Sequence, residues 1–263
     1  MTPITSSHNP RLKDLRRLQR RRERERSGLF LAEGEDLIEA AAAAGRPAVA
    51  GYRAAGATIG GADFEDVEPS VLDGFSTLGS GTRAIGVYEQ RWGEPAGPVC
   101  VYLHGVGDPG NVGTVLRSAL AFGASCVALG PGCADPHSPK AVRASMGAIF
   151  EVGLARVSDA TKLPGERIAL LAGHGEPLWA VLRGESRARA HPGKSAHDTT
   201  EQGERRPVTL LVGAEREGLP DEVVAACEHV AHIPIASESL NAAMAATVAL
   251  YEMTRPSSRV PAS

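Results

Sequence analysis

The clearest hydrophobic pattern lies near the C-terminal end of the chain. Residues 232–235 form a short apolar segment closed by a proline, and a polar loop, 236–239, separates them from residues 240–253, which contain neither Gly nor Pro. Ala, Met and Leu dominate this last segment and predict a helix, for which Ser239 is a suitable N-cap. Only Thr247 is polar in the central part of the helix. We therefore expect it to be covered on more than one side, by a second layer or a second subunit.

A second pattern of the same strength begins at residue 99. An apolar strand, 99–103, is followed by a Gly-rich loop, 104–110, and by a predicted helix, 111–122, that ends before Gly123. One face of this helix carries apolar residues at helical spacing, namely Val112, Val115, Leu116, Ala119 and Leu120. Arg117 falls off that face, roughly 130° from its centre, and is free to point into a cleft.

The remaining patterns divide the chain into two domains. In residues 1–90 helices and strands alternate, which predicts a small α/β domain. Its elements are a helix after Pro10 with Leu12, Leu15 and Leu18 on one face, helices at 35–44 and 69–78, and strands at 29–31, 49–52 and 84–88. Residues 91–98 have the composition of a linker. The second domain, 99–255, adds strands at 126–129, 168–172 and 208–212 and a short helix at 140–146.

Two segments carry no periodic pattern. Residues 183–206 are rich in Ser, Gly, Arg, His and Thr, which predicts a mobile surface insertion. Residues 256–263 form a short polar tail.

Charge is unevenly distributed along the chain. The net charge is −3, yet residues 11–26 hold nine Lys and Arg against Asp14, Glu23 and Glu25. The rest of the chain is therefore acidic, which excludes a protein that coats a polyanion uniformly but allows a local contact with one. The basic face of the first helix is either a solvated surface or a nucleic-acid contact.

Composition narrows the class of protein further. Cys100, Cys126, Cys133 and Cys227 have no Cys-x-x-Cys spacing, so neither a zinc site nor a disulfide framework is indicated. His229 and His232 stand without further ligands and are interpreted as structural histidines. No run approaches the ~20 apolar residues of a membrane span, and the N-terminus shows no apolar signal segment. We expect the protein to reside in the cytoplasm.

The loop 104–110 contains a misleading pattern. Gly105, Gly107 and Gly110 match the G-x-G-x-x-G turn of dinucleotide-binding domains, between a strand and a helix. Pro109 lacks an N–H group where a pyrophosphate needs donors, and the first acidic residue after the next strand, Asp135, comes too late to bind a ribose. A dehydrogenase is kept only as an alternative that a cofactor-binding test would decide.

Three segments in a fixed order carry the chemistry: 108–119, 211–219 and 233–241. Together they resemble the three motifs of the SpoU/TrmH branch of the SPOUT RNA 2′-O-methyltransferases, and 138–150 is also similar to that family. Asn9-Pro10-Arg11 and residues 30–35 are similar to the ribosomal-protein-like RNA-recruiting domain that precedes the catalytic domain in many members. The resemblance implies a parallel-sheet α/β fold with a C-terminal trefoil knot, a rare topology.

The resemblance also implies a site. The residues matching the family's catalytic positions are Arg117, Asn111, Glu215, Ser239 and Asn241. Those matching its S-adenosylmethionine site are Gly213, Gly218, Ile233, Ile235 and Leu240, and no metal is implied. Because a guanidinium is a poor base, we assign Arg117 to holding the target phosphate and the developing alkoxide. A surface salt bridge for Arg117, and helix capping for Asn111 and Asn241, are the alternatives.

The implied function is transfer of a methyl group from S-adenosylmethionine to a ribose 2′-hydroxyl of structured RNA by a homodimer. The N-terminal domain favours ribosomal RNA over transfer RNA as the substrate. RNA-binding residues are expected on the basic helix, namely Arg11, Arg16, Arg17 and Arg20. A non-catalytic RNA-binding or assembly protein with the same fold is the alternative of a different class.

Overall fold

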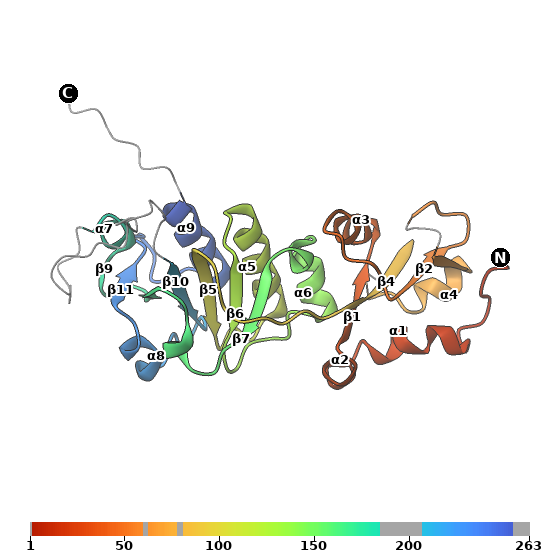
Figure 1. The fold of residues 1–263 in the computed structure, drawn as a ribbon, viewed down its shortest axis with the longest axis horizontal. Helices are drawn as coiled ribbons and strands as arrows, with labels where there is room; N and C mark the ends of the chain where they lie inside the picture. Colours follow the sequence, from red (N-terminus) through yellow and green to blue (C-terminus); the bar gives the residue numbers. More distant parts are fainter. Residues whose placement is uncertain (1, 60–62, 78–80, 185–206, 255–263) are drawn as a thin grey trace, which may run out of the picture. The chain divides into compact units, whose positions relative to one another are not determined.

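The computed structural model describes residues 2–59, 63–77, 81–184 and 207–254. Most of the predicted insertion, 183–206, and of the tail, 256–263, lies outside these residues. The chain forms two compact units. The first unit contains residues 1–92, 108–117 and 134–151, and the second contains 93–107, 118–133 and 152–263. Each unit has its own sheet (Figure 1).

The first unit is built on a four-stranded mixed sheet with the order β1-β4-β2-β3. The strands are β1 (Leu29–Glu33), β2 (Ala50–Ala54), β3 (Phe64–Val67) and β4 (Ala84–Glu89). β4 runs antiparallel to both β1 and β2, whereas β3 runs parallel to β2. Three of these strands were predicted, and β3 was not, because it is a short edge strand without alternating apolar residues.

The basic N-terminal segment is not one continuous helix, as had been predicted. It forms a 3₁₀ turn η1 (Pro10–Leu12), α1 (Lys13–Arg17) and α2 (Arg21–Ser27). Arg20 has an extended backbone, with φ −94° and ψ 132°, which breaks the helix before α2. The predicted apolar face is confirmed, because Leu12, Leu15 and Leu18 are all buried in a cluster on the sheet.

Three further helices complete the first unit, together with the N-terminal part of α5 (Pro109–Ala121). They are α3 (Glu35–Ala43), α4 (Pro69–Asp73) and α6 (Pro139–Ala144), followed by the 3₁₀ turn η2 (Ala148–Phe150). α4 is shorter than the predicted 69–78. α5 approaches α6 closely at Gly113, where an added Cβ would lie 2.3 Å from the Ala141 carbonyl oxygen.

The second unit is built on a seven-stranded sheet in which every described strand pair is parallel. Its order is β7-β6-β5-β10-β8-β11-β9. The strands are β5 (Val99–His104), β6 (Cys126–Leu129), β7 (Gly153–Arg156), β8 (Glu166–Leu170), β9 (Glu176–Pro177), β10 (Val208–Gly213) and β11 (His229–His232). The predicted parallel α/β fold is confirmed. The strand expected at 232–235 was misplaced, since β11 ends at His232, before Pro234.

Helices α7 (Leu178–Leu182), α8 (Asp221–Ala225) and α9 (Ala242–Thr254), the C-terminal part of α5 and the 3₁₀ turn η3 (Ala160–Lys162) complete the second unit. The start of α9 corrects one prediction. Its N-cap is Asn241, whose Oδ1 accepts hydrogen bonds from Ala243 N at 2.9 Å and Met244 N at 3.3 Å, so Ser239 is not the cap.

The C-terminal half of α5 packs against α9. Ser118 Oγ and Thr247 Oγ1 are 2.7 Å apart, and the rings of Phe122 and Tyr251 meet edge to face at 6.0 Å. The predicted buried face of α5 holds for its first four members, which are fully buried. It is wrong for Leu120, which is 38% exposed.

Candidate active site

The candidate site of the second unit lies where parallel strands end. β5 is hydrogen-bonded to β6 on one side and to β10 on the other, so the carboxyl ends of these strands share one edge of the sheet. Gly105, directly after β5, donates its N–H to the Pro131 carbonyl at 2.9 Å. An added Cβ on Gly132 would lie only 3.1 Å from Gly105 Cα. The loops after β5 and β6 therefore touch backbone to backbone.

The turn after β10 is equally tight. Gly213 ends the strand, and Gly218 returns to it with φ +68° and a hydrogen bond from its N–H to the Ala214 carbonyl at 2.9 Å. An added Cβ on Gly213 would meet the carbonyl carbon and oxygen of Gly218 at 2.2 Å and Leu219 N at 2.5 Å. The chain's own backbone therefore requires glycine at 213, a reason that the sequence did not reveal. A role for Gly213 and Gly218 in cofactor binding stays a prediction.

The loop between β11 and α9 brings the third motif to the second. Asn241 Nδ2 donates to Glu215 Oε1 at 3.5 Å, while its Oδ1 caps α9. Two predicted catalytic residues are thus in contact. Asn241 also caps α9, as its alternative role predicted. Ile235 is 40% exposed, an unusual position for isoleucine in a polar loop, whereas Ile233 and Leu240 are partly buried. Ser239 is exposed.

The first motif surrounds the start of α5, and its predicted catalytic residues belong to the first unit. Asp108 Oδ1 accepts hydrogen bonds from Lys140 Nζ at 2.7 Å and from Gly110 N at 2.9 Å. The bond from Lys140 is the main reason why the pKa of Asp108 is lowered. Asn111 is partly buried, and Arg117 is exposed as its spacing predicted. Within the described residues Arg117 forms no ion pair, and its role in catalysis stays a prediction.

Convergence of Arg117 and Asn111 with the second and third motifs stays a prediction. The contact described above joins the Glu215 and Asn241 side chains of the second unit only.

The predicted RNA-binding arginines are only partly available. Arg11 forms an ion pair with Glu65 at 2.5 Å, and Arg17 forms one with Glu23 at 2.9 Å. Arg16 lies over the Phe75 ring, 4.9 Å from its centroid, and Arg20 is exposed at the break between α1 and α2. The basic surface is therefore interrupted at the helix break at Arg20 and partly neutralised by the carboxylates of Glu65 and Glu23.

One basic residue of this segment is buried. Arg24 is 3% exposed, and its Nη2 lies 2.7 Å from Asp135 Oδ2. Its Nη1 donates to the carbonyl oxygens of Leu18 and Gln19 at 2.8 and 2.9 Å. The sequence left this basic segment as either a solvated surface or a nucleic-acid contact and gave no sign of a buried ion pair. Asp135, too distant in sequence to bind a dinucleotide ribose, here holds α2 instead.

His104 was also missed as a possible site residue. It ends β5 in register with Gly213, and its Nδ1 lies 3.0 Å from the hydroxyl of Tyr102. Burial raises the pKa of Tyr102 to about 12, so the phenol keeps its proton at neutral pH. Alternation along a strand, which places Tyr102 and His104 on one face, was the available signal.

Among the described residues no group of three or more His, Cys, Asp or Glu side chains is arranged to hold a metal ion. None of the helices in the described ranges has the length and apolar character needed to cross a membrane.

Comparison with known proteins decides the family. Residues 98–251 match the SpoU rRNA Methylase family, and residues 9–57 match the MRM3-like substrate binding domain. The chain belongs to the SpoU rRNA Methylase family. This SpoU protein is 30% identical to an uncharacterized tRNA/rRNA methyltransferase of Synechocystis sp., over 96% of this chain and 93% of that protein. It is 27% identical to the 23S rRNA (guanosine(2553)-2′-O)-methyltransferase RlmP of Bacillus subtilis, over 96% and 99%.

Solved structures agree with this assignment. An rRNA methyltransferase from Sinorhizobium meliloti with bound AdoMet superposes with a TM-score of 0.78, at 28% identity and 97% coverage of both chains. A putative RNA methyltransferase of the TrmH family from Porphyromonas gingivalis gives a TM-score of 0.74, at 28% identity and 93% and 96% coverage.

The family assignment confirms the expected chemistry. The protein is an RNA methyltransferase that acts on a ribose 2′-hydroxyl and uses S-adenosylmethionine. The dehydrogenase and the non-catalytic RNA-binding protein, the two alternatives of other classes, are not supported.

Proposed function

We propose that this SpoU protein methylates ribosomal RNA and that it works as a homodimer in the cytoplasm. The main support is that residues 9–57 match a substrate-binding domain and residues 98–251 match the SpoU family in the same chain. Two relatives with defined targets act on 23S rRNA: RlmP of Bacillus subtilis and a uridine-2′-O-methyltransferase of Streptomyces viridochromogenes, 35% identical over 56% of this chain and 49% of that protein. Transfer RNA is the alternative substrate.

The residues at the strand ends fit S-adenosylmethionine. Close approach of the chain at Gly105 and Gly213 brings backbone groups together along this edge of the sheet. The segments 213–218 and 233–240 would hold the cofactor, with Ile233, Ile235 and Leu240 as its apolar contacts. When bound, the cofactor supplies an electrophilic methyl group on a sulfonium.

The side chains then have separate tasks. The Arg117 guanidinium binds the phosphate of the target nucleotide and stabilises negative charge as it develops on the ribose oxygen. The hydroxyl proton leaves to a neighbouring acceptor or to solvent, since a guanidinium stays protonated. Asn111, Glu215, Ser239 and Asn241 orient the reacting groups, and the contact between Glu215 and Asn241 keeps the second and third motifs in a fixed relation.

The surface of α9 supports a dimer. Met244, Val248 and Tyr251 lie at i, i+4 and i+7 on this helix and are 58%, 38% and 49% exposed. Three large apolar side chains on one exposed face mark an interaction surface. This face of α9 is proposed as the contact with a second copy. The second copy would then cover the side of α9 that its own unit leaves exposed, so that the helix is covered on more than one side, as the sequence predicts.

The domain division is part of the proposal. Residues 1–90 recruit RNA through Arg11, Arg16, Arg17 and Arg20, residues 91–98 link the domains, and residues 99–255 carry out methyl transfer. A reducing compartment suits the four cysteines, all of which are free thiols.

The test is incubation of the protein with methyl-labelled S-adenosylmethionine and, separately, purified ribosomal RNA and transfer RNA. We expect label in ribosomal RNA at a single nucleotide, recovered as a 2′-O-methylribose after digestion. Label in transfer RNA alone would overturn the proposed substrate.

A further inference from the structure

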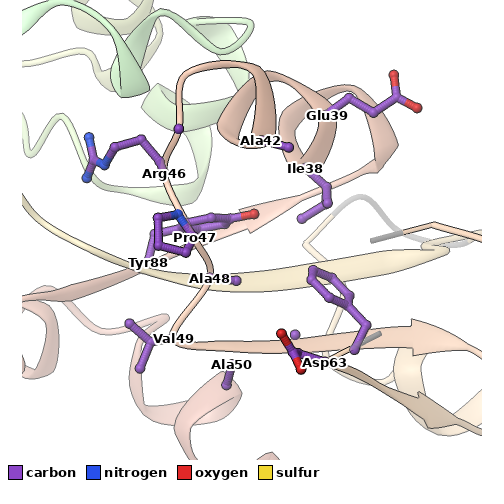
Figure 2. Close-up of a pocket in the computed structure, with 13 residues that line it drawn as sticks. Ile38, Glu39, Ala42, Arg46, Pro47, Ala48, Val49, Ala50, Asp63 and Tyr88 are labelled. Atoms are coloured by element: carbon purple, nitrogen blue, oxygen red, sulfur yellow. The ribbon is translucent and has the colours of Figure 1, made fainter. Parts of the chain in front are cut away.

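The first unit contains a cavity of about 630 Å³ away from the basic N-terminal helices. Figure 2 shows Ile38, Glu39 and Ala42 of α3 along one side of it and Val49, Ala50 and Asp63 along the other. This volume is within the range of ~300–1,000 Å³ that is usual for sites of small ligands. All the lining residues belong to the first unit, and those from 38 to 51 fall within the match to a substrate-binding domain.

Two glycines of the sheet make room for aromatic rings beside the cavity. Gly51 of β2 and Gly86 of β4 are register partners, so no side chain rises from the sheet at this point. An added Cβ on Gly51 would lie 2.4 Å from the ring of Phe64, and one on Gly86 would lie 2.5 Å from the ring of Tyr88. Two aromatic rings therefore lie directly against the sheet backbone. Tyr88 is 2% exposed, whereas Phe64 is only partly buried and offers ring surface.

The polar groups of the lining select the ligand. Glu39 and Asp63 are exposed carboxylates, which accept hydrogen bonds and repel phosphate. The cation among the described lining residues, Arg46, is 8% exposed, and its guanidinium donates to the carbonyl oxygens of Glu89 at 2.8 Å and Phe150 at 3.3 Å. The cavity is thus suited to a flat, neutral group that donates hydrogen bonds.

A nucleobase with an exocyclic amino group meets these conditions. Unpaired RNA bases stack on aromatic side chains and are recognised by hydrogen bonds along their edges. Carboxylates accept such bonds from the amino group of cytosine. We propose that this cavity binds one unpaired, amino-bearing base of the RNA substrate, stacked on Phe64, with Glu39 and Asp63 as acceptors. The inference rests on the proposed function for the identity of the ligand as RNA.

A cavity-filling substitution tests the site without touching buried groups. Ala42 is exposed on α3 and lines the cavity, whereas Ala43 is exposed on the same helix and does not line it. Ala42→Phe should raise the Kd for a fluorescein-labelled cytidine decamer about tenfold, as loss of one stacked base does. Ala43→Phe, the matched control, should change it less than about twofold. Because neither substitution removes a phosphate contact, the ratio of the Kd values of Ala42→Phe and Ala43→Phe should not change with salt concentration.

A second variant tests the hydrogen bonds. Wild-type protein should bind the cytidine decamer more tightly than a uridine decamer, which has no exocyclic amino group, and Glu39→Gln should remove most of that preference. Asp36→Asn, on the exposed side of the same helix, should keep it. Unchanged melting temperatures of all four variants show that the fold is intact.

The outcomes separate this proposal from the proposed function. Equal affinity of Ala42→Phe and Ala43→Phe for the cytidine decamer would overturn the base site, even if the wild type methylates ribosomal RNA. Weaker binding by Ala42→Phe alone supports the base site, even if methyl transfer goes to another RNA. Loss of binding of an Arg-rich decapeptide by Ala42→Phe, with RNA binding unchanged, would assign the cavity to a protein partner and overturn the inference.

Discussion

The two units hold their separate segments together by different means. In the first unit, charged and hydroxyl side chains join distant parts of the chain. Arg24 binds Asp135, 111 residues away, and the Glu33 carboxylate accepts hydrogen bonds from Ser76, Thr77 and Thr82. In the second unit, the loops at the candidate site touch through backbone groups at Gly105, Gly132, Gly213 and Gly218.

The difference suits the two tasks proposed above, cofactor binding by the second unit and RNA recognition by the first. We call the backbone groups at Gly105, Gly132, Gly213 and Gly218 the backbone cradle. Such a cradle does not change with side-chain titration, which suits a cofactor bound in one shape. Side-chain networks place aromatic and charged groups at a surface, which suits recognition of RNA. The glycines also differ: in the second unit they allow loops to touch, while Gly51 and Gly86 of the first unit leave room for the Phe64 and Tyr88 rings against a sheet face.

The largest expected effect comes from breaking the buried ion pair of the first unit. Arg24→Ala leaves the Asp135 carboxylate buried, with an exposed side-chain fraction of 9%, and without its main partner. Loss of one member of such a pair costs about 3–5 kcal/mol of unfolding free energy. Hydrogen exchange of the β1 and β4 amides measures that loss, and Arg22→Ala, an exposed arginine on the same helix, is the control. Equal protection in both variants would show that the pair does not hold this unit together.

The next test separates chemistry from cofactor binding. Arg117→Ala should lower the rate of methyl transfer about 10²–10³-fold, because a donor to developing charge is lost. The Kd for S-adenosylmethionine, measured by calorimetry, should stay within about twofold, since the proposed cradle is made of backbone. An unchanged rate would remove Arg117 from the mechanism.

A smaller effect is expected from adding one methyl group to the cradle. Gly213→Ala forces Cβ against the backbone of Gly218 and Leu219, which should cost about 1–3 kcal/mol of stability and weaken cofactor binding. Gly107→Ala is the matched control, because its nearest atom would be the Gly105 carbonyl oxygen at an ordinary 3.9 Å. The melting temperature with and without S-adenosylmethionine checks both variants. A Gly213→Ala protein as stable as the control would contradict the backbone account.

The smallest effect is a difference in pH dependence. Burial alone would raise the pKa of Glu33, but hydrogen bonds from Ser76, Thr82 and Thr77 outweigh it, and the pKa is lowered from 4.5. Ionised Glu33 therefore stabilises the first unit above its ordinary pKa, and that stability is lost as the pH falls through the lowered value.

Glu33→Gln should accordingly flatten the decline in stability below about pH 5 by about 1 kcal/mol. Urea unfolding at a series of pH values measures it, with Glu68→Gln as an exposed control. Identical pH profiles of the wild type and Glu33→Gln would disprove the stabilising role of this carboxylate.

Sequence patterns predicted most interior strands, although β11 was misplaced, and missed every described edge strand except β1. β5, β6, β8 and β10 are covered on both sides by neighbouring strands, and their apolar runs were recognisable. The three missed strands, β3, β7 and β9, each lie at the edge of a sheet. An edge strand needs fewer apolar residues, so its pattern is weak.

Long-range side-chain contacts explain the other errors. The leucine spacing correctly predicted a buried face on the N-terminal segment, yet nothing local predicts the break at Arg20. There the Arg24 guanidinium binds the carbonyl oxygens of Leu18 and Gln19 while pairing with distant Asp135. At the site, the motifs predicted the candidate residues, and the contact between Glu215 and Asn241 joins two of them. The backbone requirement at Gly213 depends on a turn whose close approach the sequence does not predict.

We propose that the second unit binds the cofactor through its backbone cradle and that the first unit binds RNA through side chains. Hydrogen exchange with each ligand alone tests this proposal most directly. S-adenosylmethionine should protect the amides of residues 213–218 and 233–241 and leave those of residues 10–54 unchanged. A ribosomal RNA fragment that accepts the methyl group should protect amides within 10–54. Protection of the first unit by S-adenosylmethionine, with none at 213–218, would contradict the account.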